Sequence, residues 1–443
     1  MKRLVLFALI AAITACASTE TTPAPTAAPT AVPTAVPTAG PVTLQLWTVL
    51  PDNGINGQNL GELIQLFHQE YPLIDIAVSS QPTYTDLYRK VIASIAAGTL
   101  PDLVSGPDAD MLQYARMNAL TPLDDLLSTT NGLSAADLAD IPAAMLETMK
   151  LRDQGGKTYS LPFARGVLAL YYNWSVMKGI GITNTPRSWD EFKLHAKTLT
   201  RNPVRGFSYR AEAAVFDAML ISRGGSFFSP DLTKATFNSQ AGIDSLYYLS
   251  EGVKEGWIYR AEGTSDMTDF SSGRTIFNIA TTAAIPAYQA AMDDAVKKGV
   301  KSFEWGVALL PQADTARASA LLAGSNIGML KGTPAKQQAA RTFLRWLMQD
   351  KTSAHWSEAA GVLPSRLAAQ AQLATLFARA PQQKQAFQNL LPIAHPEPAI
   401  RAAQDVRDLV EGAIAAFESG KTQPKAALDD AAAKSTILLN DKK

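Results

Sequence analysis

Apolar residues in the first third of the chain follow the periods of strands and helices in turn. Val42, Leu44 and Leu46 alternate with polar positions, as in a strand with one buried face. Further on, apolar residues recur at helical spacing and then alternate again. The pattern predicts, in order, a strand at 42–50, a helix around 60–67, a strand at 74–78, a helix around 87–95 and a strand from 101. This alternation is typical of a parallel α/β sheet with right-handed crossovers.

The stretch 155–192 combines a strand and a helix start. Val167 to Tyr172 is an apolar, aromatic run with strand character. Pro162 is placed just before this strand, because proline can border a strand but not occupy its centre. Ser188 is a candidate N-cap for the next helix, with Glu191 at the capping-box spacing. Here we expect the chain to leave one lobe and begin another.

The N-terminus has the pattern of a targeting segment. Lys2 and Arg3 precede an apolar run, 4–13, that is too short to span a bilayer. The sole cysteine, Cys16, follows Ala15, and this junction resembles a bacterial lipobox. We therefore predict a signal peptide at 1–15 and a lipid on Cys16; ordinary secretion with cleavage nearby is the alternative.

Residues 16–41 are rich in Pro, Thr and Ala and cannot form a core. An extended Pro-rich segment of this length reaches on the order of 75 Å. We predict a tether that holds a globular domain at the outer face of a membrane.

Composition excludes several classes of function. Basic and acidic residues are balanced at 40 each, which does not favour nucleic acid as a partner. The four histidines are dispersed, and the motifs HExxH and GxSxG do not occur, so neither a catalytic centre nor a metal site is predicted. Two GKT triplets lack the earlier glycine of a phosphate loop. We expect no cofactor and no enzymatic activity.

Short motifs in a shared order carry a family resemblance. They include GKTYSLP at 156–162, LYYN at 170–173, PRSWDEF at 186–192, AAGTLPD at 96–102 and WSEAAGVLPSR at 356–366. Together they resemble bacterial extracellular solute-binding proteins of family 1, the carbohydrate-type receptors of ABC importers. The resemblance implies a periplasmic-binding-protein-like α/β fold, with two α/β lobes joined by a hinge that the chain crosses about three times. It also implies a monomer that delivers its ligand to permease subunits.

We predict lobe I at 42–165 and 326–372, and lobe II at 166–325 and 373–443. Closure would rotate the lobes about Ala164–Arg165 and Gly324–Ser325, where small residues can absorb backbone change.

Ligands of open α/β sheets bind beyond the carboxyl ends of strands, so the candidate site residues lie in such loops and at the crossings. Carboxylates, amides and arginines would bind sugar hydroxyls, and aromatic rings would stack on the sugar. The candidates are Trp47, Asp52, Asn53, Tyr84, Ser105, Asp108, Arg165, Tyr209, Arg210, Glu212, Gly324, Ser325, Asn326 and Arg366. Asp108 and Glu212 are expected to face each other as hydroxyl acceptors, one from each lobe.

Some of these candidates have structural alternatives. Trp47 can equally pack on its strand, and Asp108 can cap a helix. Arg165 can hold an ion pair at the hinge, and Arg366 can tie parts of the fold together.

The predicted ligand is a sugar or small oligosaccharide, with polyols of the glycerol-phosphate type as the alternative. Alanines stand at 283 and 403, where maltodextrin receptors carry stacking tryptophans, and at 399, where glycerol-phosphate receptors carry an arginine. Neither ligand is therefore fixed. From other classes, a secreted, tethered glycoside hydrolase or a surface protein without a ligand would share the N-terminal pattern.

Overall fold

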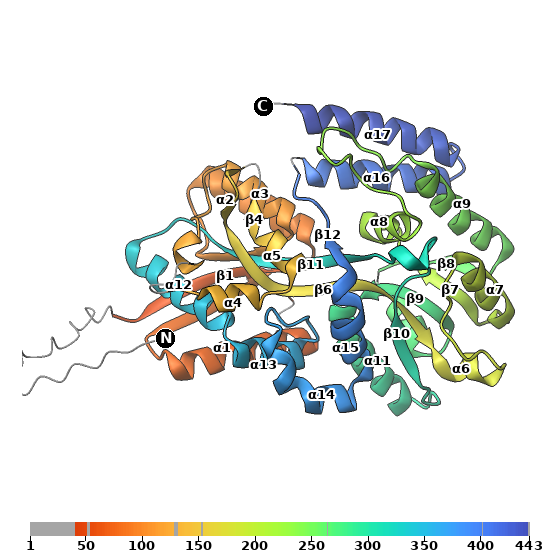
Figure 1. The fold of residues 1–443 in the computed structure, drawn as a ribbon, viewed down its shortest axis with the longest axis horizontal. Helices are drawn as coiled ribbons and strands as arrows, with labels where there is room; N and C mark the ends of the chain where they lie inside the picture. The colour runs from red at the N-terminus through yellow and green to blue at the C-terminus, as the bar shows by residue number, and fades with distance from the viewer. Residues whose placement is uncertain are drawn as a thin grey trace, which may run out of the picture. The chain divides into compact units, whose positions relative to one another are not determined.

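A mixed β-sheet, ten-stranded over the described residues, runs through the computed structural model (Figure 1). Its strands follow the order β2-β1-β3-β11-β6-β9-β7-β8, with β10 paired to β6 and β12 paired to β11. Their bounds are β1 Val42–Thr48, β2 Ile74–Ser80, β3 Leu103–Gly106, β6 Ser160–Asn173, β7 Arg205–Tyr209, β8 Ile258–Arg260, β9 Thr275–Thr281, β10 Trp305–Ala308, β11 Ala320–Met329 and β12 Ala394–Pro396. A separate hairpin pairs β4 (Lys150–Leu151) with β5 (Lys157–Thr158).

The structure describes residues 40–50, 54–127, 132–151, 154–263, 265–400 and 402–441. The described residues from 41 onward form one compact unit. The predicted signal peptide, Cys16 and nearly all of the predicted tether lie outside the described residues. In the part of the chain that is described, none of the helices has both the length and the apolar character needed to cross a membrane.

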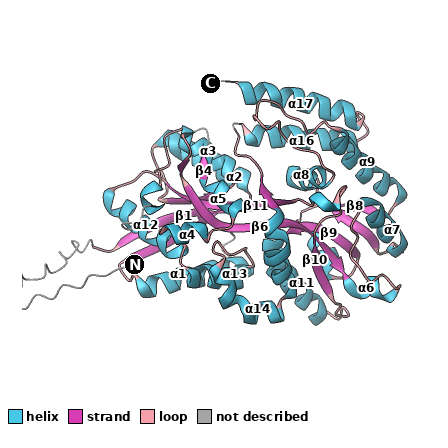
Figure 2. Ribbon diagram, viewed as in Figure 1, coloured by secondary structure: helices cyan, strands magenta, loops and turns pink. Residues whose placement is uncertain are grey.

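Helices flank this sheet (Figure 2). They are α1 Gly54–Glu70, α2 Tyr84–Ala97, α3 Asp108–Arg116, α4 Ala135–Ala139, α5 Ala143–Met149, α6 Trp174–Gly179, α7 Trp189–Leu199, α8 Ala213–Ser222, α9 Gln240–Glu255, α10 Ser265–Ser271, α11 Ile285–Lys297, α12 Pro334–Leu347, α13 Asp350–Ala360, α14 Ala374–Arg379, α15 Pro381–Gln385, α16 Ala403–Glu418 and α17 Pro424–Asn440. The two C-terminal helices, α16 and α17, pack against each other and against α8 and α9.

The sequence prediction for the first part of the sheet is confirmed. β1 pairs in parallel with both β2 and β3, and α1 and α2 connect these strands. The inward side chains Leu44 and Leu46 are fully buried, as their alternation predicts. Thr83 caps α2 through its side chain, and Gly98 ends that helix with a left-handed backbone, the usual C-terminal role of glycine.

The centre of the sheet corrects one prediction. Pro162 lies inside β6 and not before it, so the strand is longer than the apolar run 167–172 indicated. The antiparallel pairing of β6 with β11 shifts register between Ser325 and Asn326, opposite Pro162. The extra residue of this bulge is Phe163, which lies in β6 between the paired residues Pro162 and Ala164. Bulges are among the few places where a sheet tolerates proline.

The helix start after β6 is confirmed. The side chain of Ser188 caps α7 by accepting a hydrogen bond from the backbone N–H of Glu191. The Glu191 carboxylate accepts from the N–H of Arg187, one residue before the cap, and not from Ser188 itself. The sequence therefore placed this helix correctly and missed only the second bond of the capping box.

The predicted hinge residues lie beside one another in the sheet. Gly324 is paired with Arg165, and Ser325 with Ala164, on the neighbouring strands β11 and β6. Both predicted crossings are thus made by hydrogen-bonded strands. The division into two lobes stays a prediction, and it is taken up again under the proposed function.

Candidate functional site

A cavity of about 570 Å³ opens where several helices begin against the centre of the sheet. The first residues of α2, α3 and α8 line it, together with parts of β6 and β11. The segment after β12 and α16 also contribute to its wall. The volume is in the range of pockets that enclose small organic ligands.

The structure brings part of the predicted site together here. The predicted residues that line the cavity are Tyr84, Asp108, Arg165, Arg210, Glu212 and Gly324. Tyr84 supplies the one aromatic ring among the described lining residues. Burial raises the pKa of the Tyr84 phenol, and a hydrogen bond with Ser325 partly offsets this.

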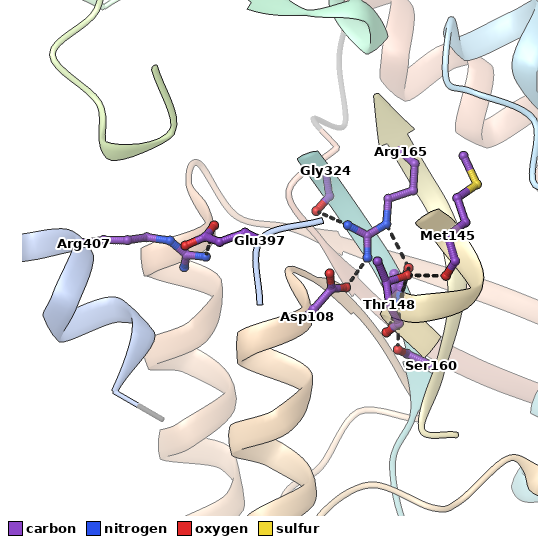
Figure 3. A network of polar contacts seen from close by, with 9 residues as sticks. Asp108, Met145, Thr148, Ser160, Arg165, Gly324, Glu397 and Arg407 are labelled. Atoms are coloured by element: carbon purple, nitrogen blue, oxygen red, sulfur yellow. Dashed lines mark hydrogen bonds and ion pairs between the residues drawn. The ribbon is translucent and has the colours of Figure 1, made fainter. Parts of the chain in front are cut away.

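Arg165 and Asp108 form a buried ion pair at the cavity wall (Figure 3). The guanidinium also donates from Nε to Asn326 Oδ1 at 2.9 Å and from Nη1 to the carbonyl of Gly324 at 3.4 Å. Burial raises the pKa of Asp108, while the positive charge of Arg165 acts to lower it. The alternative prediction of an ion pair for Arg165 is confirmed.

This pairing changes the expected role of Asp108. Its Oδ1 accepts from Arg165 and is not free for a ligand hydroxyl. Its predicted role as a helix cap is wrong, because Pro107 occupies the N-cap of α3 and Asp108 is the first helical residue. Asp108 at the start of the helix is still well placed electrostatically, since the N-terminal end of a helix is positive.

Glu212 and Arg210 form the other side of the cavity. Glu212 is the N-cap residue of α8, and Arg210 Nη1 lies 3.0 Å from its Oε1. Arg210 Nε also lies 3.4 Å from the buried carboxylate of Asp266. Burial raises the pKa of Glu212, Arg210 acts to lower it, and Glu411 acts to raise it. Glu212 makes no capping bond, so its second carboxylate oxygen, Oε2, can accept from a ligand.

Three of the predicted residues are behind the cavity wall and not at its surface. Asn326 is fully buried, where its side chain donates to Thr148 and Ser160. Ser105 donates to Thr48 Oγ1 at 2.8 Å, and Ser325 contacts Tyr84. Their hydrogen bonds hold the wall together, and none of the three lines the cavity.

Three more lie away from the cavity. Trp47 packs on its strand, with Lys90 Nζ 4.2 Å from the ring centroid. Tyr209 is buried and donates its hydroxyl to Glu418. Arg366 binds Asp137 at 2.6 Å and Asp140 at 2.8 Å, which matches the structural alternative for this residue. The remaining candidates, Asp52 and Asn53, lie outside the described residues.

Sequence reasoning missed the contribution of the C-terminal segment. Gln404, Arg407, Asp408 and Glu411 line the cavity from α16, and Glu397 does so from the segment after β12. Arg407 Nη2 lies 3.3 Å from Glu397 Oε2, and Glu397 raises the pKa of Arg407 (Figure 3). The four helix residues have the spacing i, i+3, i+4, i+7, so they share one face. This polar helix face was the feature of the sequence that could have indicated a contribution of α16 to the cavity.

The cavity can bind a polar solute. Carboxylates and arginines surround it, and its apolar wall includes Leu168, Leu321 and Leu322. Within the described ranges, no group of three or more His, Cys, Asp or Glu side chains is arranged to hold a metal ion. Fold and cavity together define a solute-binding protein with a mixed α/β sheet.

The chain belongs to the bacterial extracellular solute-binding protein family, whose sequence model matches residues 62–386. This confirms the resemblance found in the motifs. A protein of Brucella abortus (strain 2308), named as a binding protein, is 25% identical over 404 residues, which are 88% of this chain and 92% of the relative.

Two solved structures are similar in fold. The cyclic alpha-maltosyl-1,6-maltose binding protein from Arthrobacter globiformis has a TM-score of 0.73 at 22% identity, covering 90% of this chain and 99% of that one. UgpB from Mycobacterium tuberculosis, solved in complex with glycerophosphocholine, has a TM-score of 0.77 at 19% identity, covering 91% and 99%. At these identities the likeness shows the shared fold.

Proposed function

We propose that this protein is the substrate-binding component of an ABC importer and that it captures a sugar or small oligosaccharide. The observation that carries the proposal is the cavity of about 570 Å³, with hydrogen-bonding side chains on several walls and the Tyr84 ring on one. Carboxylates such as Glu212 are strong acceptors for sugar hydroxyls when water is excluded. The fold is shared with a protein named for binding a maltosyl-maltose sugar.

Polyols of the glycerol-phosphate type are the second candidate. Three arginines, Arg165, Arg210 and Arg407, line the cavity, and arginine is well suited to bind phosphate. A structure of similar fold was solved with glycerophosphocholine. In either case the protein binds its ligand without turnover, and permease subunits are the partner that receives it.

The two lobes follow the sequence assignment in this proposal, with 42–165 and 326–372 in the first and 166–325 and 373–443 in the second. The cavity residues come from both sets: Asp108 and Tyr84 from the first, Glu212 and Arg407 from the second. Rotation of one lobe against the other would open and close the cavity around the ligand.

A thermal-shift screen of sugars, sugar alcohols and phosphorylated polyols tests the proposed function. A ligand present at about 100 times its dissociation constant is expected to add about 2.7 kcal/mol to the free energy of unfolding. Glu212→Gln keeps the shape of the side chain. It is expected to weaken the binding of a ligand that donates hydroxyl hydrogen bonds by roughly 10-fold or more. A screen in which no solute raises the melting temperature would count against the proposal, and turnover of a chromogenic glycoside would favour a hydrolase.

We also propose that Cys16 carries a lipid that anchors the protein at the extracytoplasmic face of the membrane. The support is its position after Ala15, where the apolar run ends, and its being the sole cysteine. Cys16→Ser protein is expected to move from the membrane fraction to the soluble fraction and to keep the melting temperature of the parent. Mature wild-type protein that is free in the culture fluid and cut beyond Cys16 would contradict the anchor.

A further inference from the structure

Helix α8 begins at the cavity. Glu212, Ala213 and Ala214, at its first positions, all line the cavity wall. The first N–H groups of a helix have no partner inside the helix, and the helix dipole makes this end positive. Helix starts are therefore common binding places for phosphate groups. The group that occupies the start of α8 therefore affects whether the cavity binds negatively charged or neutral ligands.

A carboxylate of the protein itself occupies this position. The backbone N–H of Ala213 donates to Glu411 Oε1 at 3.1 Å. Glu411 comes from α16, 198 residues further along the chain, and it also lines the cavity. An anionic ligand at the start of α8 would have to displace this carboxylate or lie beside it.

The arginines of the cavity likewise already form ion pairs with carboxylates of the protein. Arg165 is paired with Asp108, Arg210 with Glu212, and Arg407 with Glu397. Two further carboxylates of the lining, Asp408 and Glu411, have no lysine or arginine partner among the described residues; Asp408 accepts from Gln404. The described lining therefore carries more negative than positive charge.

We propose that Glu411 acts as a built-in anion that determines specificity: by occupying the start of α8, it excludes phosphorylated ligands. The ligand class that fits is an uncharged polyhydroxy compound, because a hydroxyl can donate to a Glu411 oxygen where a phosphate would be repelled. This inference rests on the proposed function, namely that this cavity binds the transported solute.

Two substitutions test the role of Glu411, with inorganic phosphate and glycerol 3-phosphate as probes. Glu411→Gln removes the charge and keeps an oxygen that can accept from Ala213. Glu411→Ala also frees the N–H. Asp405→Asn is the matched control, because it removes one negative charge from an exposed position on the same helix, outside the lining of this cavity.

Calorimetry at low ionic strength measures the affinity for both probes. Each probe is expected to bind to the Glu411 variants about tenfold more tightly than to the wild type, and the increase in affinity should be larger for Glu411→Ala. Asp405→Asn should behave as the wild type does. The proposal is overturned if wild type binds glycerol 3-phosphate within twofold of the folded Glu411 variants, or if Asp405→Asn gains as much. Failure of every neutral sugar to bind wild type would instead count against the proposed function, and the phosphate comparison would still stand.

Discussion

Arg165→Met should destabilise the protein by about 3–5 kcal/mol, because it leaves the carboxylate of Asp108 buried without its partner. The Arg165 side chain is 3% exposed and the Asp108 side chain 9% exposed, so water replaces little of the lost interaction. Asn326 and the carbonyl of Gly324 lose a donor at the same time. Urea denaturation followed by circular dichroism measures the change in the free energy of unfolding.

A matched control separates burial from charge. Arg379→Met also removes a paired arginine, but the Arg379 side chain is 63% exposed and its partner Glu358 is 43% exposed. Its cost is expected to stay below about 1 kcal/mol, as for exposed ion pairs. Combining Arg165→Met with Asp108→Asn should recover part of the loss, since no unpaired charge stays buried. A loss below about 1 kcal/mol for Arg165→Met alone would contradict this account.

Gly324→Ala should cost about 3 kcal/mol or more, through two effects that add. Gly324 has a φ of +98°, a conformation that residues with a Cβ rarely adopt. A Cβ built there would also lie 2.1 Å from the carbonyl oxygen of Ala164 on the paired strand. Because both atoms belong to the β6–β11 pairing at the cavity wall, relief of the clash requires the strands to move apart.

Gly299→Ala provides the comparison for this prediction. Gly299 has a similar φ, +93°, but a Cβ there meets no atom within 4 Å. It should therefore show the backbone strain alone, about 1–2 kcal/mol. Unfolding curves of the two variants, recorded in urea under the same conditions, give the difference. Equal losses for the two variants would mean that the close approach of β6 and β11 carries no cost.

The sequence predicted the first part of the fold well because local patterns determine it. The alternation at Leu44 and Leu46 identifies β1, and Gly98 marks the end of α2. The extent of β6 was underestimated, because β6 bulges at Phe163, next to Pro162, where it pairs with β11. No pattern within β6 itself carries that information, since it depends on how β11 pairs with it.

The candidate site was predicted in part for a similar reason. Asp108 and Glu212 follow β3 and β7 closely, and the rule that ligands bind beyond strand ends finds such residues. Arg407 and Glu411 come from a helix that follows the strands of the sheet in sequence. A polar helix face looks the same in sequence whether it meets solvent or a cavity. Asn326 was expected at the site because it lies at a lobe crossing, and Ser105 because it lies at a strand end. Both side chains form hydrogen bonds inside the wall.

The position of α16 has an evolutionary consequence. One face of this helix contributes Gln404, Arg407, Asp408 and Glu411 to the cavity, while Val406 and Val410 on its other face anchor it in the core. Substitutions on the first face would alter the charge and size of the cavity and leave the sheet and its hydrogen bonds untouched. Selection can thus change the nutrient that such a receptor collects by changing one helix face, while the scaffold is inherited intact.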